Sequence, residues 1–195
     1  MPSYITMMMT RLPRDWFDRP APAVARDLIG AQLLVRGAGG RITETEAYAT
    51  DDPASHSFRG PSPRNASMFG MPALAYVYRS YGIHWCLNVV CTSGSAVLIR
   101  ALEPLSGLDN MARRRGVTDL RRLCNGPGCI GQALGLGPAD DGADILTILG
   151  GPAMDVISGP RIGISRAVDV PWRFGERGSR FLSKPFREHE RPGIG

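Results

Sequence analysis

Residues 42–48 constrain the fold of this chain more than any other segment. Their β-branched residues alternate with acidic ones, a pattern typical of a β-strand, and residues two apart on a strand project from the same face. We therefore expect Glu44, Glu46 and Tyr48 to lie on one face. The strand runs directly into a loop that is rich in proline, serine and glycine and carries His56, and such a strand commonly positions catalytic groups. An edge strand with its acidic side chains in water would show the same pattern.

The rest of the chain shows no internal repeat and no long linker, which favours a single domain over residues 1–195. Alternating segments separated by turns predict an antiparallel meander of hairpins at residues 31–35, 41–47, 74–79, 83–90 and 96–102. A short helix is predicted at residues 20–28, and three more, which should cover one face of the sheet, at residues 108–115, 119–124 and 129–134. The predicted fold class is α+β, one compact domain.

The remaining segments are shorter or irregular. Residues 145–149 and 161–165 are predicted to form further short strands. We expect residues 1–15 to be a loose start. Residues 176–195 are expected to form a basic tail that could lie along a phosphate backbone, although a solvated surface would explain its charge nearly as well.

Composition narrows the class of protein. With 195 residues, of which 43% are hydrophobic, the chain can bury a substantial core. No apolar run is long enough to span a membrane and residues 1–10 lack the pattern of a secretion signal, so we expect a cytoplasmic protein. The four cysteines form no C-x-x-C pair, and none of the three histidines stands at ligand spacing from a cysteine. This favours reduced packing thiols and argues against a metal site.

The charge of the chain indicates an anionic partner. The net charge is +5, and the 23 basic residues include a single lysine, Lys184, so that arginine supplies the others. The planar guanidinium of arginine can bind two phosphate oxygens at once. For a cytosolic protein such a partner is usually nucleic acid. A GC-rich genome would explain the arginine content equally well.

The glycines at residues 126–131 match the pattern G-x-G-x-x-G of dinucleotide-binding folds. The motif follows a basic helical segment instead of a strand, and no unit of strand, helix and parallel strand surrounds it. We therefore interpret it as the start of a helix whose glycines allow another backbone to approach closely. Its backbone amides could still hold a phosphate.

Tyrosines gather on the second predicted hairpin. Tyr76 and Tyr78 share a strand face, and Tyr81 occupies the turn. Tyr81 is either an ordinary surface tyrosine or a wedge that enters a base stack and holds open the space left by an extruded nucleotide. In the second interpretation, Tyr48, His56 and Tyr78 could form a flat-walled pocket that grips a purine by stacking.

Together, these motifs resemble those of one known family. The matching segments are Glu44-Thr45-Glu46-Ala47-Tyr48, His56-Ser57, Pro63-Arg64-Asn65, Met68-Phe69, Tyr76-Val77-Tyr78, Tyr81-Gly82, Asn88 and residues 98–105, with a weaker match at residues 161–164. They follow one another in the order found in the alkyladenine (3-methyladenine, or methylpurine) DNA glycosylases. The resemblance implies a curved antiparallel sheet. It also implies an enzyme that flips damaged purines from duplex DNA and hydrolyses the N-glycosidic bond with no metal or other cofactor.

The resemblance also implies roles for individual residues. Glu46 matches the general base for the attacking water, and Arg100 and the carbonyl of Ile162 match groups that help to hold that water. The residues that match the base-binding site and the wedge are Tyr48, His56 and Tyr78 as stacking walls, Asn88 as the residue that excludes the guanine amino group, and Tyr81 as the intercalating tyrosine.

Contacts with the rest of the DNA are less directly implied. We expect Arg64 and Arg79 at the DNA backbone, double-stranded DNA with damaged purines as the partner, and a monomeric protein. The chain departs from the family pattern at two places. Ile83 follows the turn where some relatives have methionine, which should change the wedge. Gly128-Cys129 replaces a more usual lysine-bearing pair, which weakens the case for a phosphate contact there.

The chemistry of the bond explains why one carboxylate could suffice. The bond breaks through a sugar with oxocarbenium character, so a nearby anion stabilises the transition state and can take a proton from incoming water. Purines alkylated at N3 or N7, such as 3-methyladenine and 7-methylguanine, are cationic and leave readily, whereas neutral hypoxanthine needs a proton from elsewhere. Because Lys184 lies in the C-terminal stretch, we expect hydrolysis alone and no strand-cleaving lyase step.

Other interpretations stay open on the sequence alone. Glu44 could be the base, or could support Glu46 through hydrogen bonds. A sugar-cleaving carboxylate pair is disfavoured because residues two apart on a strand point the same way, whereas such pairs flank the bond. A zinc deaminase would need H-x-E and P-C-x-x-C, which the chain lacks. A non-catalytic module that recognises distorted DNA would explain the arginines and tyrosines, but not a pocket-facing Glu46.

Overall fold

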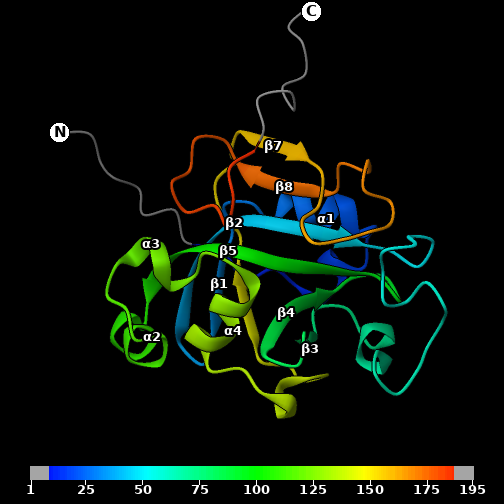
Figure 1. Ribbon diagram of the computed structural model, residues 1–195, viewed down its shortest axis with the longest axis horizontal. Coiled ribbons are helices and arrows are strands. Elements are labelled where there is room, and N and C mark those ends of the chain that lie inside the picture. Colours follow the sequence, from blue (N-terminus) through cyan, green and yellow to red (C-terminus); the bar gives the residue numbers. More distant parts are fainter. Residues whose placement is uncertain (1–8, 187–195) are drawn as a thin grey trace, which may run out of the picture.

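The computed structural model describes residues 9–186. These residues form a single domain with one curled antiparallel sheet, shaped as a half-barrel, and a few short helices (Figure 1). The α+β fold predicted from the sequence is confirmed. The strands of the sheet are β1 (Gln32–Val35), β2 (Ala38–Tyr48), β3 (Ala75–Ser80), β4 (His84–Val90), β5 (Ala96–Ser106), β6 (Leu146–Leu149), β7 (Val156–Gly159) and β8 (Arg173–Glu176).

The helices lie at two places around this sheet. α1 (Ala21–Asp27) packs against β2, β5 and β8, whereas α2 (Leu108–Arg115), α3 (Leu120–Leu123) and α4 (Pro127–Leu134) gather together beside β4 and β5 (Figure 1). Three 3₁₀ turns complete the described elements: η1 (Arg14–Phe17), η2 (Ala66–Phe69) and η3 (Pro138–Asp140). All four helices predicted from the sequence are present.

The order of strands in the sheet is β3-β4-β5-β2-β1-β6, and β8 pairs with β2 and β7. The five strands of the expected meander are present, but β2 and β3 are not neighbours. The chain instead leaves β2 through residues 49–74, forms the β3–β4 hairpin and returns as β5 along β2. This return brings the two longest strands together in the middle of the sheet, which sequence patterning alone did not indicate.

The prediction of a strand at residues 161–165 is wrong. The segment is an irregular loop, and the pattern missed β7 and β8 on either side of it. Gly163 has a φ of +76°, which is outside the β region. The amide of Ile162 donates to a carboxylate of β2, so it is not part of a strand ladder.

Both ends of the described chain are held by the sheet. Residues 1–8 of the expected loose start lie outside the described residues, but Arg11 forms a β-bridge with Leu149, and the amide of Leu12 donates to Ile148. Residues 187–195 of the expected basic tail also lie outside, whereas residues 176–186 fold back over β8. Phe181 is buried, and the ring of Phe186 lies directly over Gly175, where a methyl group would collide with it.

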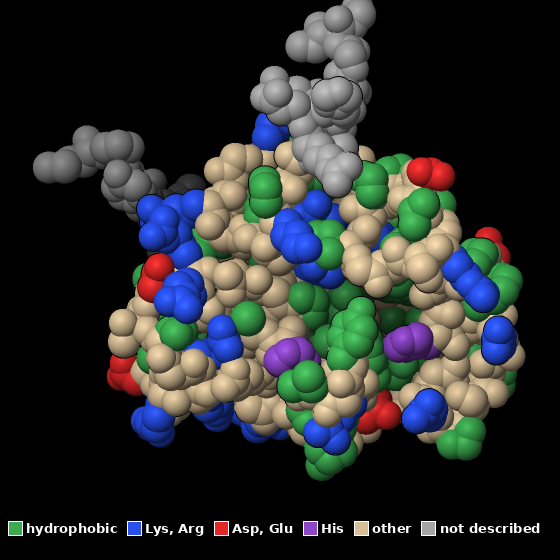
Figure 2. All heavy atoms as spheres, in the orientation of Figure 1, with side chains coloured by type: hydrophobic (Ala, Val, Ile, Leu, Met, Phe, Trp, Pro, Cys, Tyr) green, Lys and Arg blue, Asp and Glu red, His purple; other side chains and the backbone are tan. Residues whose placement is uncertain are grey.

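The β3–β4 hairpin projects from the sheet and is supported from one side by α4. Its turn is closed by a hydrogen bond of 3.0 Å from the Ile83 amide to the Ser80 carbonyl, with positive φ at both Tyr81 and Gly82. The face that contains this hairpin is hollowed at its centre, and hydrophobic side chains line the hollow (Figure 2).

The glycine motif of residues 126–131 starts α4, as predicted. A methyl group on Gly131 would lie 1.9 Å from the carbonyl oxygen of Trp85, so only glycine lets this helix approach β4 so closely.

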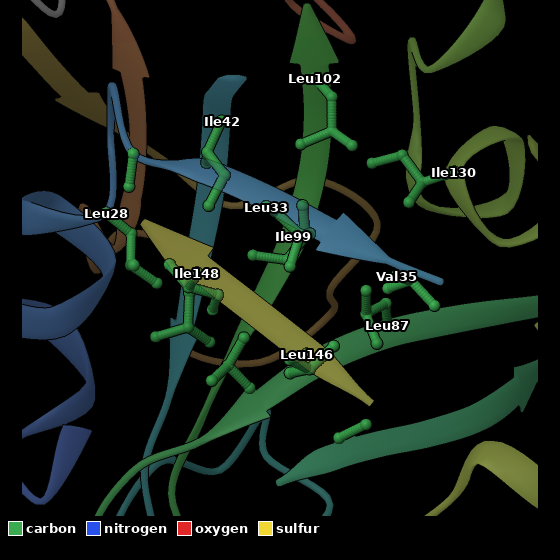
Figure 3. Packing of buried hydrophobic residues seen from close by; sticks show 14 of the residues in the cluster. Leu28, Leu33, Val35, Ile42, Leu87, Ile99, Leu102, Ile130, Leu146 and Ile148 are labelled. Atoms are coloured by element: carbon green, nitrogen blue, oxygen red, sulfur yellow. The ribbon is translucent and has the colours of Figure 1, made fainter. Parts of the chain in front are cut away.

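The hydrophobic core lies inside the curl of the sheet. Leu33, Ile99 and Ile148 come from three different strands and point toward one another (Figure 3). Leu28, from the turn after α1, and Ile130 of α4 close the core at its two ends. Because the core holds β2 and β5 firmly together, the polar side chains on their other face have a rigid support.

Candidate active site

The strands β2 and β5 bring two carboxylates and one guanidinium together. Glu46 stands opposite Leu98 in the ladder, and register shifts on both sides of Glu44 adjust its direction. Arg100 lies between the two acids: its Nε is 3.0 Å from Glu44 Oε1, and its Nη1 is 3.3 Å from Glu46 Oε2. Glu44 and Glu46 therefore share one face, as the alternation predicted, and Arg100 bridges them.

Glu46 is completely buried and receives three hydrogen bonds. The amide of Ile162 donates to Oε1 at 2.7 Å, and the hydroxyl of Tyr48 donates to Oε2 at 2.9 Å, beside the contact with Arg100. Burial raises the pKa of the Glu46 carboxyl above its ordinary value, and Arg100, the Ile162 amide and the Tyr48 hydroxyl offset part of this rise. This environment is one in which a carboxylate becomes a stronger base.

Glu44 is also completely buried, but its oxygens are more fully occupied. Oε1 accepts from Arg100, from Arg173 Nε at 2.8 Å and from Ser183 Oγ at 2.8 Å, while Oε2 accepts from the Ser183 amide at 2.6 Å. Two guanidinium groups and a segment from the end of the chain therefore hold this carboxylate. The residue pattern around Glu44 could not predict its hydrogen bonds with Arg173 and Ser183, because both residues lie more than a hundred positions later in the chain.

A cavity of about 1130 Å³ opens in front of these groups. It is the hollow visible in Figure 2, where two histidine side chains stand at its rim and basic side chains surround it. Arg100, Tyr48 and Ile162 line this cavity, whereas the Glu46 side chain lies directly behind them. The carboxylate thus touches the cavity wall through each of its three partners.

Three of the predicted site residues, Tyr48, His56 and Tyr78, form an aromatic wall of this cavity, although their rings are not all parallel. His56 and Tyr78 meet edge to face, with ring centroids 4.6 Å apart and planes at 83°. His56 Nδ1 lies 2.8 Å from the hydroxyl of Tyr76, which is buried. Burial lowers the pKa of His56, so the imidazole is neutral at pH 7. The sequence spacing correctly predicted that Tyr76 shares a strand face with Tyr78, but it did not predict the hydrogen bond between Tyr76 and His56.

Asn88 lies at the floor of the same cavity. Its side chain is buried, and Nδ2 donates to the Tyr76 carbonyl at 3.0 Å, which fixes the orientation of the amide. Leu98, its partner in the β4–β5 ladder, lines the cavity beside it.

The hairpin tip and the two predicted backbone arginines lie at the rim. Tyr81 is 86% exposed, and Ile83, beside it, is 68% exposed. Arg64 and Arg79 are exposed residues that line the mouth of the cavity, and the guanidinium of Arg79 lies 5.9 Å from the Trp85 ring centroid. These positions are compatible with contacts to a large polyanionic ligand.

A buried ion pair that the motifs did not predict joins the two loops beside the cavity. Arg161 donates to both carboxylate oxygens of Asp52 and, at 2.9 Å, to the carbonyl of Ala47. Its guanidinium also lies 4.8 Å from the ring centroid of Tyr48. Arg161 therefore places both the Tyr48 ring and the neighbouring Ile162 amide against Glu46.

Among residues 9–186, no three His, Cys, Asp or Glu side chains gather as metal ligands would, and no helix is long and apolar enough to cross a membrane. The four cysteines carry free thiols, and Cys86, Cys91 and Cys124 are buried, in agreement with the expected packing role.

Comparison with known proteins assigns this chain to a family. The family model described as "Methylpurine-DNA glycosylase (MPG)" matches residues 15–180. The chain belongs to the methylpurine-DNA glycosylase family. The resemblance identified from the motifs is confirmed, and so is the enzyme class, a DNA glycosylase that hydrolyses N-glycosyl bonds.

Individual relatives match over most of their length. A "Putative 3-methyladenine DNA glycosylase" of Rhodopseudomonas palustris (strain BisB18) is 58% identical over 186 residues, which cover 91% of this chain and 93% of the relative. A protein of the same name from Nitrosospira multiformis is 59% identical over 180 residues, covering 88% of this chain and 93% of the relative. Another, from Agrobacterium fabrum, is 55% identical over 185 residues, with 92% and 96% covered.

Proposed function

We propose that this enzyme, a DNA glycosylase of base excision repair, flips 3-methyladenine and other alkylated purines out of duplex DNA. It hydrolyses the N-glycosidic bond with a water activated by Glu46 and leaves an abasic site. The observation that carries the proposal is the buried Glu46 carboxylate, bound to Arg100, Tyr48 and Ile162, directly behind a cavity of about 1130 Å³ with aromatic walls.

The hydrogen bonds of the two carboxylates favour Glu46 over Glu44 as the base. A carboxylate offers about four lone-pair sites for donors. Each acid has one oxygen with a single donor and therefore a lone pair left for water: for Glu46 Oε1 the donor is the amide of Ile162, a residue of the cavity wall, whereas for Glu44 Oε2 it is the amide of Ser183, which does not line the cavity. Glu46 contacts three residues of the cavity wall, Arg100, Tyr48 and Ile162, whereas Glu44 contacts only Arg100 among them. Glu44 then orients Arg100 and takes no part in proton transfer.

The reaction needs one ionised carboxylate near the sugar. Glu46 stabilises the oxocarbenium character of the sugar and takes a proton from the water that attacks C1′. The water's oxygen forms the new bond to C1′ while the bond to the purine nitrogen breaks and its electron pair leaves with the base. In this arrangement Arg100 keeps Glu46 ionised, and the Ile162 carbonyl helps to hold the water.

The aromatic wall favours cationic purines as substrates. The rings of Tyr48 and Tyr78 present negative faces to a positively charged base, and neutral His56 adds no repulsive charge. An N3- or N7-alkylated purine leaves without further protonation, which makes 3-methyladenine and 7-methylguanine the favoured substrates. Asn88, with its fixed amide, is the residue that discriminates against the amino group of unmodified guanine.

Entry of the base depends on the hairpin tip. Tyr81 occupies the position from which an aromatic ring can fill the gap in the base stack, while Arg64 and Arg79 bind phosphates at the rim. Each of these three roles supports flipping and leaves the chemical step to the groups behind the cavity. The protein acts as a monomer.

The deciding experiment uses the whole protein with duplex DNA treated with a methylating agent. Released 3-methyladenine and 7-methylguanine are separated from the DNA by chromatography, and inosine-containing duplexes test hypoxanthine in parallel. Release of free 3-methyladenine supports the proposal. Binding to the methylated duplex without release of any base would reject it in favour of a module that only recognises damage.

The same reaction mixture tests the hydrolytic route. Borohydride reduces an imine between an amine of the protein and the opened sugar to a stable adduct, as a lyase would form. We expect free base and an intact abasic strand with no trapped adduct. A covalent protein–DNA adduct would contradict simple hydrolysis.

A further inference from the structure

The C-terminal segment of residues 181–186 packs against the back of the carboxylate pair. Ser183 makes two contacts with Glu44, from its amide at 2.6 Å and from its hydroxyl at 2.8 Å. Its hydroxyl oxygen in turn accepts a hydrogen bond of 3.3 Å from Arg100 Nη2. Ser183 therefore touches both groups that stand between it and Glu46. The matched family model ends at residue 180, before this segment begins.

The segment is fixed by contacts on both sides of Ser183. The Phe181 carbonyl accepts from Thr43 Oγ1 at 3.0 Å, and Phe181 itself is buried. Beyond Ser183, the guanidinium of Arg173 donates to the Lys184 carbonyl and lies 3.9 Å from the ring centroid of Phe186. Arg173 is also a donor to Glu44, so the segment is bound to the carboxylate both directly and through this arginine.

The geometry links these contacts to the reacting groups in a short chain. Arg100 uses Nε for Glu44, Nη2 for Ser183 and Nη1 for Glu46. A guanidinium is planar, so fixing two of its nitrogens fixes the direction of the third. The contact at Nη1 is the longest of those that Glu46 receives, and a small rotation of the guanidinium would break it.

We propose that Ser183 is a positioning residue, which orients Arg100 toward Glu46 through its own hydroxyl and through Glu44. Residues 181–186 are thus part of the active site, although none of them lines the cavity. This inference rests on the proposed function, because it assigns Ser183 to the reaction in which Glu46 acts as base. Removal of the hydroxyl should slow the chemical step and leave binding of the flipped base unchanged.

The charged and titratable groups that face Glu46 make this effect measurable by pH. They are Arg100 from β5, Tyr48 and Glu44 from β2, and Tyr78 from β3. Of these, Arg100 lowers the pKa of Glu46 the most. If Arg100 turns away, the carboxyl holds its proton to higher pH. The acidic limb of the rate profile, where the base becomes ionised, therefore moves to higher pH in a variant that misplaces Arg100.

The test compares Ser183→Ala with Ser179→Ala under single-turnover conditions on a duplex with one 7-methylguanine. Ser179 lies in the same stretch, where its hydroxyl accepts from the Phe181 amide at 3.3 Å, but it has no contact with Glu44 or Arg100. We expect Ser183→Ala to lower the rate of base release about tenfold and to shift the acidic limb upward. Binding to a duplex with an uncleavable abasic analogue should be unchanged. Ser179→Ala should behave as wild type, and Ser183→Thr should restore most of the rate.

Two further measurements separate positioning from damage to the fold. Thr43→Val, which releases Phe181 without touching Arg100, should shift the limb in the same direction by a smaller amount, and thermal melting reports the stability of each variant. A rate equal to wild type in Ser183→Ala, or a slower rate with an unmoved acidic limb, overturns the inference. A wild-type protein that releases no base overturns the proposed function itself, whatever the serine variants do.

Discussion

The groups behind the cavity and the hairpin tip at its rim are built in opposite ways. Glu46 and Arg100 are buried, and Arg100 is held by residues from two other segments of the chain, Glu44 and Glu46 of β2 and Ser183 of residues 181–186. Tyr81 and Ile83, in contrast, stand in solvent beside a turn with positive φ. In the proposed mechanism, the charge that acts on the transition state is thus preorganised inside the protein. The proposed wedge, in contrast, is left exposed, because its packing partner in the proposal is the duplex.

The largest effect is expected from Glu46→Gln. This change keeps the volume of the side chain but removes the proton acceptor, so base release should fall roughly a thousandfold or more. Affinity for damaged duplex should stay near that of wild type, since the cavity wall is retained. Single-turnover release and a filter-binding or anisotropy titration measure the two quantities.

The matched control for that variant is Glu103→Gln, which changes a half-buried carboxylate of β5 that pairs with Arg41 outside the site. It should keep nearly full activity. If Glu46→Gln releases base as fast as Glu103→Gln, the role of Glu46 as base is ruled out.

The support of the hairpin is tested by Gly131→Ala. The added methyl group would lie 1.9 Å from the Trp85 carbonyl oxygen, so α4 must move away from β4. We expect a loss of about 3 kcal/mol in the free energy of unfolding, measured with urea. Gly137→Ala, where no atom lies within 4 Å of the added methyl group, should change stability little. Equal stability of the two variants would show that α4 does not depend on close contact with β4.

The buried part of the site was only partly predictable from the sequence. The period of two in residues 42–48 correctly placed Glu44 and Glu46 on one face, because alternation on a strand is a local property. Arg173 reaches Glu44 through the antiparallel pairing of β8 with β2, and Ser183 reaches it from the segment that follows β8; no local period encodes either contact. Sequence patterns could thus find the acids, but not the groups that hold them.

The irregular loops around the cavity were harder still to predict. The apolar residues Ile162 and Ile164 alternate as on a strand, yet Gly163 turns the backbone and frees the Ile162 amide for Glu46. The buried ion pair of Asp52 with Arg161 fixes this loop from a position more than a hundred residues earlier. The exposed tip was easier, since a tyrosine followed by glycine in a hairpin turn has a local signature.

The tip itself is tested by Tyr81→Ala. Because Tyr81 is 86% exposed, its loss should not affect stability, but the gap in the base stack would go unfilled. We expect base release from duplex DNA to fall roughly tenfold or more, and release from single-stranded DNA to change little. Leu105→Ala, which truncates another exposed apolar residue away from the cavity, should affect neither substrate. An equal loss on both substrates would argue against the wedge.

The smallest effect, and the one most specific to the buried side, is expected from Tyr48→Phe. The change keeps the ring in the cavity wall but removes the hydroxyl that donates to Glu46 Oε2 at 2.9 Å. This donor lowers the pKa of Glu46, so its removal should raise that pKa further. Because the base acts only when it is ionised, the acidic limb of the rate profile should move to higher pH. The rate of base release should fall severalfold at pH values below this limb and change little at pH values well above it. Tyr76→Phe, which removes a hydroxyl bound to His56 instead, should leave the limb in place. A limb that moves equally in both variants would mean that the tyrosines act on the cavity as a whole and not on the charge of Glu46.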